Sequence, residues 1–416
     1  MPGARPRNRN ASRRPGNGLL RPTIRNPEAF ILRGVNDRVS RSMKMKLPSL
    51  SHEPSLASRL VHAISARLSV VSIGMVCAGC LIAGSGSDSA RASDAVALFR
   101  SGDTVELTIS APWRRIVRDR ANQDPYPASL EYIDESGSRE IITLTVERRG
   151  KTRQRICRFP PVKLRFDKSD VKETLFEGNK SIKMVTHCDN GRRWEQYYIL
   201  EMLAYPIYNV ITDRSFRIRP LSVTYHDSDR DRNDGPRFAF LIEDDKLVAN
   251  RNGLDKYDAA DIPADRLDSL ESSRFALFQY LIGNEDWSSL GGPPGEDCCH
   301  NAKLIAPESG EPLYALPYDF DSSGFVDAHY AAPNDGLRIS KVSQRLYRGF
   351  CLHNSTLETA RDEFLQNKQT IQAIVEGEPR LRSRTRSRAT RYLDGFFTVM
   401  EDPELFERAI KGACRK

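Results

Sequence analysis

The hydrophobic pattern of the chain changes its period within residues 181–211, which read SIKMVTHCDNGRRWEQYYILEMLAYPIYNVI. Residues 181–186 alternate apolar and polar side chains, which is typical of a short strand with one buried face. Residues 194–211 place apolar and aromatic side chains three and four positions apart, which predicts a helix with a broad buried face. Pro206 should kink this helix, because proline lacks the amide donor and crowds the preceding turn. The stretch therefore predicts a strand that leads into a long helix.

Strands are predicted on both sides of this helix, and helices predominate in the last part of the chain. Period-two alternation predicts further strands at residues 105–111, 142–146, 156–166, 217–225 and 237–242. Beyond residue 244 we predict a short strand pair at 300–305 and 313–317 and helices at about 340–350, 357–375, 382–399 and 402–413. This order predicts an α+β fold with two lobes: a β-rich N-terminal lobe, residues 93–243, and a mostly helical C-terminal lobe, residues 244–416.

The positive charge of the chain is concentrated near its N-terminus. The 416 residues carry a formal net charge of +8. Residues 1–92 contain 15 Lys or Arg and 4 Asp or Glu, which leaves 48 basic and 51 acidic residues in 93–416. A slightly acidic folded part does not offer the basic surface that nucleic-acid binding requires. We therefore expect no nucleic-acid partner.

The first 92 residues are typical of an export leader. Residues 1–42 are rich in Arg, Asn, Pro and Gly and are predicted to be disordered, or to lie upstream of the true start. Residues 43–92 contain a basic region, the uncharged run 68–84 and the small-x-small sequence Ala90-Arg91-Ala92, in the order found in a cleaved secretory signal. The alternative is a membrane anchor through residues 68–84, although 17 residues with three Gly are marginal for spanning a bilayer. We expect a periplasmic or secreted protein, or one anchored in the membrane and facing outside.

The cysteines agree with export. Six follow the predicted cleavage site: Cys157, Cys188, Cys298, Cys299, Cys351 and Cys414. An oxidising compartment permits disulfides between them. Cys157 and Cys188 end two neighbouring predicted strands, so we favour this pair among the alternatives. Cys298-Cys299 is not a CxxC motif, and no second Cys or His pair supplies the spacing of a zinc site.

Three polar clusters in the second half of the chain could carry chemistry: Gly283-Asn284-Glu285-Asp286-Trp287, His300-Asn301 and Pro317-Tyr318-Asp319-Phe320-Asp321-Ser322-Ser323-Gly324. Phosphoryl transfer needs an Asp that orients or deprotonates the acceptor hydroxyl, and an Asn and an Asp that hold Mg²⁺ on the phosphates. Asp286, Asn301 and Asp319 supply these residue types in this order, and their oxygen atoms suit Mg²⁺. In the alternative interpretation, the aspartates only cap turns.

Lys183 and Glu201 could complete such a site from the first half of the chain. Lys183 lies on a predicted strand and Glu201 on the helix that follows it. A Lys–Glu pair placed in this way orients the lysine toward nucleotide phosphates in kinase-like folds. Lys163 and Glu195 are alternative partners, and each of these residues alone could be an ordinary surface charge.

Two other charged segments do not indicate a ligand site. The run Asp227–Asp234 has Arg232 where a calcium loop needs its Gly and Phe238 where the loop needs its last Glu. Asn233-Asp234-Gly235 is better interpreted as a hairpin turn. The arginines of residues 380–391 are expected to lie on a solvated helix face.

The order of these features over residues 145–325 resembles that of the bacterial spore-coat-protein-H-type (CotH-like) atypical protein kinases and, more distantly, of the HipA-type kinases. The features that carry the resemblance are the Arg149-Gly150 turn, the proline-containing segment Arg158–Leu164, Asn284-x-Asp286, His300-Asn301 and Pro317–Asp321. The resemblance implies a two-lobed protein-kinase-like fold. It also implies transfer of phosphate from ATP, with Mg²⁺ or Mn²⁺, to a protein or envelope component.

The resemblance also implies roles for single residues. Asp286 would be the catalytic aspartate, Asn301 and Asp319 would bind the metal, and Lys183, oriented by Glu201, would contact the phosphates of ATP. Two other hypotheses stand beside this one. The protein could be a catalytically inactive binding module of the cell envelope that keeps the fold and its acidic cleft, or a structural envelope protein without a functional cleft.

Overall fold

The computed structural model describes residues 96–120, 122, 124–150 and 152–416. The predicted leader, residues 1–42 and 43–92 with the run 68–84, lies outside the described residues. Among the described residues, the structure contains no helix with the length and apolar character of a membrane span. The described cysteines form three disulfides: Cys157–Cys188, Cys298–Cys299 and Cys351–Cys414. The predicted pairing of Cys157 with Cys188 is confirmed.

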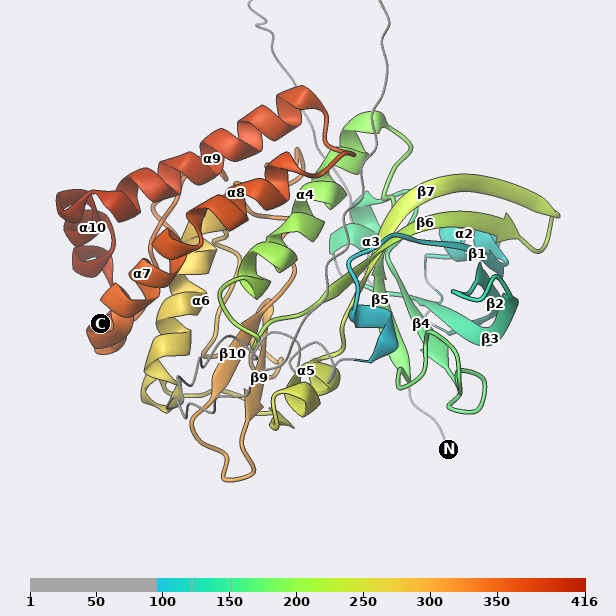
Figure 1. The fold of residues 1–416 in the computed structure, drawn as a ribbon, viewed down its shortest axis with the longest axis horizontal. Coiled ribbons are helices and arrows are strands. Elements are labelled where there is room, and N and C mark those ends of the chain that lie inside the picture. The colour runs from blue at the N-terminus through green and yellow to red at the C-terminus, as the bar shows by residue number, and fades with distance from the viewer. Residues whose placement is uncertain (1–95, 121, 123, 151) are drawn as a thin grey trace, which may run out of the picture. The chain divides into compact units, whose positions relative to one another are not determined.

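Seven strands close into a barrel (Figure 1). In the order of the ring they are β1 (Val105–Ala111), β2 (Tyr126–Ile133), β3 (Arg139–Arg148), β4 (Val162–Phe166), β5 (Ser181–Val185), β7 (Arg232–Ile242) and β6 (Ile218–Asp227). Neighbouring strands run antiparallel, except that β1 and β6 run parallel and close the ring. Their register extends from Val105 opposite Leu221 to Ala111 opposite Asp227.

One apolar cluster binds the barrel together. In β1 the buried positions alternate with exposed or half-buried ones, as the period of the sequence predicts. Every strand of the ring contributes at least one fully or almost fully buried side chain to this cluster: Leu107, Leu130, Leu144, Leu164, Ile182, Leu221 and Leu241. Short helical segments connect strands of the ring, namely α2 (Trp113–Arg118) between β1 and β2 and α3 (Thr152–Ile156) between β3 and β4, and η1 (Ala97–Phe99) precedes β1. Burial of these aliphatic side chains stabilises the ring.

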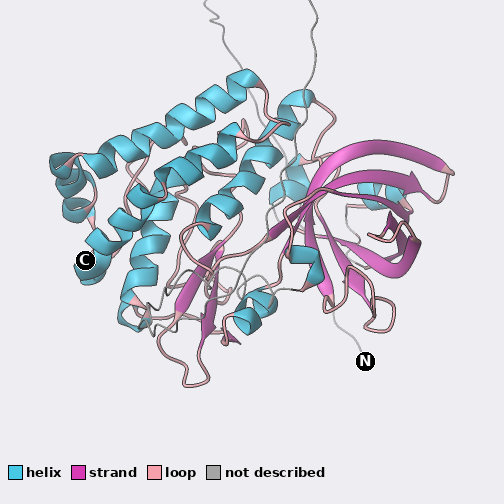
Figure 2. Ribbon diagram, viewed as in Figure 1, coloured by secondary structure: helices cyan, strands magenta, loops and turns pink. Residues whose placement is uncertain are grey.

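The remaining elements are mainly helical (Figure 2). They are α4 (Arg192–Asn209), α5 (Asp245–Arg251), η2 (Ala264–Arg266), α6 (Ser269–Ile282), η3 (Cys351–Thr356), α7 (Leu357–Gln366), α8 (Lys368–Glu376), α9 (Ser383–Glu401), α10 (Pro403–Ala409) and η4 (Lys411–Ala413). A second, antiparallel sheet has the order β10 (Tyr314–Pro317), β9 (Ala302–Ala306), β8 (Asp255–Tyr257). Helix α4 contacts β6 and β7 of the barrel as well as α8, so it joins the barrel to the helices.

The fold class predicted from the sequence, an α+β fold with the two lobes of a protein kinase, is wrong. The strands of residues 105–242 do not form the sheet of a kinase-like lobe, because β1 pairs with β6 and closes a mixed barrel. Period-two alternation shows which face of a strand is buried but not which strand lies beside it. The closing pair joins residues 105–111 to residues 221–227, and no local pattern reveals such a distant pairing.

Several single elements that the sequence predicts are present in the structure, although the predicted fold is not. The strand of residues 181–186 and the helix of residues 194–211 are confirmed as β5 and α4, and Pro206 lies inside α4. The helix predicted at residues 340–350 is wrong. Tertiary hydrogen bonds take its place, because Arg345 donates to the carbonyl oxygens of Tyr280 and Leu281 at the end of α6, at 2.9 and 3.1 Å.

Candidate active site

A cavity of about 740 Å³ is lined by residues from both halves of the described chain. Its lining includes most of the predicted site residues, namely Glu201, Asp286, Asn301 and Asp319. It also includes Arg149, Arg153, His300, Lys303 and Asp321. We call this cavity the cleft. Its volume lies within the range that small-molecule sites occupy.

The end of α6 positions Asp286. The helix ends at Gly283, which adopts a left-handed conformation with φ of 57°. A side chain there would also collide with Tyr392, because a Cβ atom would lie 2.0 Å from the Tyr392 hydroxyl oxygen. The loop that follows is held by Asn284, whose Oδ1 accepts from the Asp286 amide at 3.1 Å and whose carbonyl accepts from the Trp287 indole at 2.9 Å. The backbone at Asp286 is therefore fixed on both sides.

The Asp286 carboxylate contacts His300 and Asn301. One carboxylate oxygen lies 2.7 Å from His300 Nε2, and the other accepts from Asn301 Nδ2 at 3.1 Å. Asn301 Nδ2 also donates to the Asp286 carbonyl at 2.7 Å. The hydrogen bond with the Asp286 carboxylate raises the pKa of His300, because it favours the imidazolium. These three residues form one polar cluster although 14 positions separate Asp286 from His300.

The small sheet brings Asn301 and Asp319 together. Asn301 directly precedes β9 and Asp319 lies just beyond β10, and these antiparallel strands pair Ala302 with Pro317. The Tyr318 amide donates to the Asn301 carbonyl at 3.2 Å. Asn301 and Asp319 both adopt positive φ angles, 49° and 62°. Such conformations are uncommon outside glycine and concentrate at functional sites.

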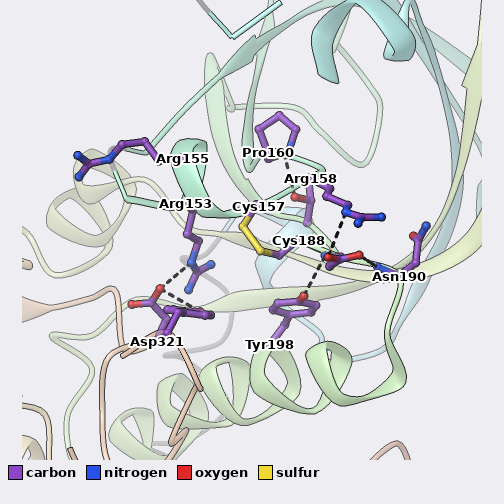
Figure 3. Close-up of a disulfide and its surroundings, with 12 residues drawn as sticks. Arg153, Arg155, Cys157, Arg158, Pro160, Cys188, Asn190, Tyr198 and Asp321 are labelled. Atoms are coloured by element: carbon purple, nitrogen blue, oxygen red, sulfur yellow. Dashed lines mark hydrogen bonds and ion pairs between the residues drawn. A yellow bond between two sulfur atoms is a disulfide. The ribbon is translucent and has the colours of Figure 1, made fainter. Parts of the chain in front are cut away.

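A buried arginine holds the acidic wall of the cleft. Arg153 of α3 donates to the Asp321 carboxylate at 2.7 Å and to Glu201 of α4 at 2.5 Å, and it lies 4.0 Å from Asp319. Figure 3 shows Arg153 pointing toward Asp321 beside the Cys157–Cys188 disulfide. Three carboxylates surround one guanidinium, and burial raises the pKa of one of them, Glu201, to about 8. Burial and the neighbouring Asp321 raise the pKa of Asp319. A bound cation would lower this pKa again, because it favours the ionised carboxylate.

The predicted pairing of Lys183 with Glu201 is not formed. Glu201 is 2% exposed and binds Arg153, whereas Lys183 lies over the Tyr318 ring, 4.8 Å from its centroid. Lys303 lies over the same ring at 5.7 Å. Within the described residues, Lys183 makes no ion pair closer than 4 Å, and burial lowers its pKa to about 8. The alternative lysine, Lys163, pairs with Glu147 at 3.7 Å.

The sequence therefore indicated Asp286, Asn301 and Asp319 together, and the structure brings all three to the cleft. It missed Arg153, the residue that binds Glu201. No motif marks this arginine, since it lies in a segment with several basic residues between a turn and a predicted strand. A buried glutamate on an otherwise apolar helix face was the available signal, because a buried carboxylate needs a cationic partner.

The remaining question is which oxygen atoms of the cleft could hold a divalent cation together with a phosphate ligand. No group of three or more His, Cys, Asp or Glu side chains is arranged to hold a metal within the described ranges. Asp321 is engaged by Arg153 and by the hydroxyls of Ser322 and Tyr330, both at 3.2 Å. Asn301 and Asp319 remain as oxygen donors. Mg²⁺ usually binds one or two protein ligands and completes its shell with phosphates and water, so two protein donors would be enough for such a site.

Comparison with the models of known protein families and with curated proteins finds no match for this chain. The resemblance to CotH-like kinases thus stays a prediction, and the functional argument depends on the geometry of the cleft.

Proposed function

We propose that the cleft binds ATP with Mg²⁺ or Mn²⁺ and transfers the terminal phosphate to a hydroxyl group of a protein or envelope component. The observation that carries this proposal is the meeting of Asp286, Asn301 and Asp319, from three separate loops, in one cavity of about 740 Å³. These are the residue types that phosphoryl transfer requires. The proposal concerns the chemistry of the site and does not depend on a kinase-like fold.

Asp286 would act on the acceptor. The hydroxyl oxygen forms a bond to the terminal phosphorus, the bond from phosphorus to the bridging oxygen breaks, and the hydroxyl proton passes to the Asp286 carboxylate. His300 and Asn301 hydrogen-bond this carboxylate and would fix its orientation. When bound, the cation would neutralise charge on the phosphates, and Asn301 and Asp319 would hold it.

Basic residues in and beside the cleft would bind the phosphates. Arg149 and Lys303 line the cleft, and Lys183 lies beside Lys303 on the Tyr318 ring. The predicted role of Lys183 thus remains a proposal, with Tyr318 rather than Glu201 as its neighbour. Bound phosphate would favour the protonated lysine, whose pKa is about 8 without a ligand. Glu201 would act only by positioning Arg153.

A non-catalytic binding module is the second candidate. Both carboxylate oxygens of Asp286 are engaged, one by His300 and the other by Asn301, as they would be for an aspartate that only stabilises its loop. For either function we propose that the protein is exported to the periplasm or secreted. The three disulfides support export, because such bonds persist in oxidising compartments.

Two measurements test the proposed function. Thermal unfolding with ATP and Mg²⁺ or Mn²⁺ should give a higher midpoint than without them, because ligands that bind the native state stabilise it. Labelled phosphate should reach a protein or envelope acceptor. Asp286→Asn should abolish transfer and keep the thermal shift, whereas Asp319→Asn should lose both. Asp170→Asn, at an exposed position, is the matched control and should change neither.

The outcomes separate the two candidates. A thermal shift without transfer in the unchanged protein would favour the binding module. The absence of a shift with either metal would contradict nucleotide binding altogether.

A further inference from the structure

A second cavity, of about 340 Å³, is lined by four arginines. Arg214 and Arg217 lie between α4 and β6, Arg251 is the last residue of α5, and Arg274 lies on α6. The acidic residue in the lining is Asp213. The cavity shares no lining residue with the cleft, so it would be a separate site.

Buried or half-buried carboxylates fix three of these arginines. Arg251 and Glu243 are 4% and 1% exposed and lie 3.0 Å apart. Arg214 and Arg274 both donate to the same oxygen of Glu271, each at 2.8 Å. Arg274 also binds both carboxylate oxygens of Glu363. This rigid framework holds guanidinium groups around the cavity before any ligand arrives.

The fourth arginine keeps its donors free. In the described part of the chain, the Arg217 guanidinium makes no hydrogen bond or ion pair, although its backbone amide donates to Glu243 at 3.0 Å. Arg214 Nε is also buried without a described hydrogen-bond partner, while the guanidinium lies 4.2 Å from the centroid of the Tyr314 ring. Buried polar groups without partners are rare in native proteins, and each calls for an explanation.

The charges of the lining favour an anion. Burial and the neighbouring guanidinium of Arg251 lower the pKa of Arg217, because two like charges lie close together. Glu243 and Glu271 are buried and do not line the cavity, so the lining itself carries four arginines and one carboxylate, Asp213. An anion placed among the arginines would relieve the repulsion and satisfy the free donors of Arg217.

We propose that this cavity binds the phosphate group of a small phosphate monoester or of inorganic phosphate, with Arg217 as the bidentate donor. A guanidinium matches two phosphate oxygens with two parallel hydrogen bonds. A volume of about 340 Å³ accommodates a phosphate with a small polar carrier and is at the lower end of ligand sites. This inference is independent of phosphoryl transfer in the cleft.

Binding of inorganic phosphate and of glycerol 3-phosphate to the full chain tests the proposal. Isothermal titration calorimetry at constant ionic strength should detect at least one of the two ligands. Arg217→Gln should weaken its affinity tenfold or more, because hydrogen bonds between charged groups are lost. Arg217→Lys should retain part of the affinity, because lysine keeps the positive charge but lacks the two parallel donors of the guanidinium.

Two controls locate the binding site. Arg338→Gln removes one positive charge from an exposed position and should leave the affinity unchanged. Arg149→Gln alters the cleft and should also leave it unchanged, which separates this site from the proposed ATP site. The proposal would be overturned if neither ligand bound. It would also be overturned if the affinity of Arg217→Gln stayed within twofold of that of the unchanged protein.

Discussion

At the scale of single residues, Asp286 and His300 form a hydrogen-bonded pair at 2.7 Å in the cleft. A carboxylate beside an imidazole favours the imidazolium. The folded-state pKa of His300 therefore lies above its ordinary value of 6.5. The pair stabilises the fold at pH values below 6.5, and this contribution is lost as the pH rises through the raised pKa.

The first prediction concerns this pKa. Asp286→Asn should lower the pKa of His300 toward or below 6.5, because the anionic partner is replaced by a neutral amide and burial then disfavours the charged ring. Nuclear magnetic resonance titration of the histidine ring protons measures the change. Asp170→Asn should leave the titration of His300 as it is. An unchanged pKa in Asp286→Asn would mean that the pair does not form in solution.

The second prediction concerns Arg153. Arg153→Met leaves Glu201 and Asp321 buried without their cation, so the free energy of unfolding should fall by about 3–5 kcal/mol. Arg139→Met is the matched control, because Arg139 binds Glu131 at 2.6 Å with 62% of its side chain exposed. An exposed ion pair contributes little to stability, so this substitution should cost much less than Arg153→Met. Urea unfolding measures both. Equal losses in the two variants would show that the Arg153 cluster is not the buried network described above.

At the scale of elements, the Cys157–Cys188 disulfide anchors the segment that carries Arg153. Cys157 directly follows α3, its amide donates to the Arg153 carbonyl at 2.9 Å, and the Cys188 carbonyl accepts from Phe159 at 3.0 Å. A helix of five residues is too short to be stable by itself. We infer that the disulfide keeps α3, and with it the guanidinium, in place.

The third prediction follows from this anchoring. Replacement of both cysteines, Cys157→Ser with Cys188→Ser, should lower the free energy of unfolding by about 2–4 kcal/mol, because the unfolded chain regains the entropy of a closed loop. In that background Arg153→Met should cost less than in the unchanged protein, and a double-mutant cycle measures the difference. Cys351→Ser with Cys414→Ser serves as the control background. Additive losses would contradict the coupling between the disulfide and Arg153.

Local chemistry could be predicted from the sequence, whereas partners distant in the sequence could not. Asp286, Asn301 and Asp319 stand at the ends of elements that periodicity and turn residues mark, so their order was visible. Lys183 was paired with Glu201 by position alone, although Arg153 is the actual partner. Helix α3 has five residues, which is too few for a helical period to emerge, so no helix was predicted between the turn at Arg149-Gly150 and the strand predicted from residue 156.

For the whole molecule, the decisive feature is the closure of the barrel by β1 and β6. A sheet that closes has no free edge, which removes the unpaired amides and carbonyls on which other chains could pair. Both strands also place buried side chains in the common cluster. Closure thus pairs β1 with β6. The segments that carry α3 and α4 lie between these two strands in the sequence, so the hydrogen bonds of the ring fix both ends of this part of the chain.

The fourth prediction tests this closure. Glu106 of β1 lies opposite Ser222 of β6, and neighbouring strands bring Cα atoms within the range that a disulfide spans. Glu106→Cys with Ser222→Cys should therefore crosslink in the oxidised, folded protein, as peptide mass spectrometry would detect. The bond should add at most about 4–5 kcal/mol of stability, the value for a loop on the order of 100 residues.

The control pair is Glu106→Cys with Arg165→Cys. Arg165 lies on β4, three strands from β1 in the ring. The usual spacing between neighbouring strands puts these two strands roughly 14 Å apart. It should not crosslink with position 106, because a disulfide cannot span more than about 7 Å between Cα atoms. A folded protein in which the two cysteines introduced at positions 106 and 222 stay reduced would indicate a sheet that is open at β1. In that case the pairing of β1 with β6, and with it the correction of the predicted fold, would be wrong.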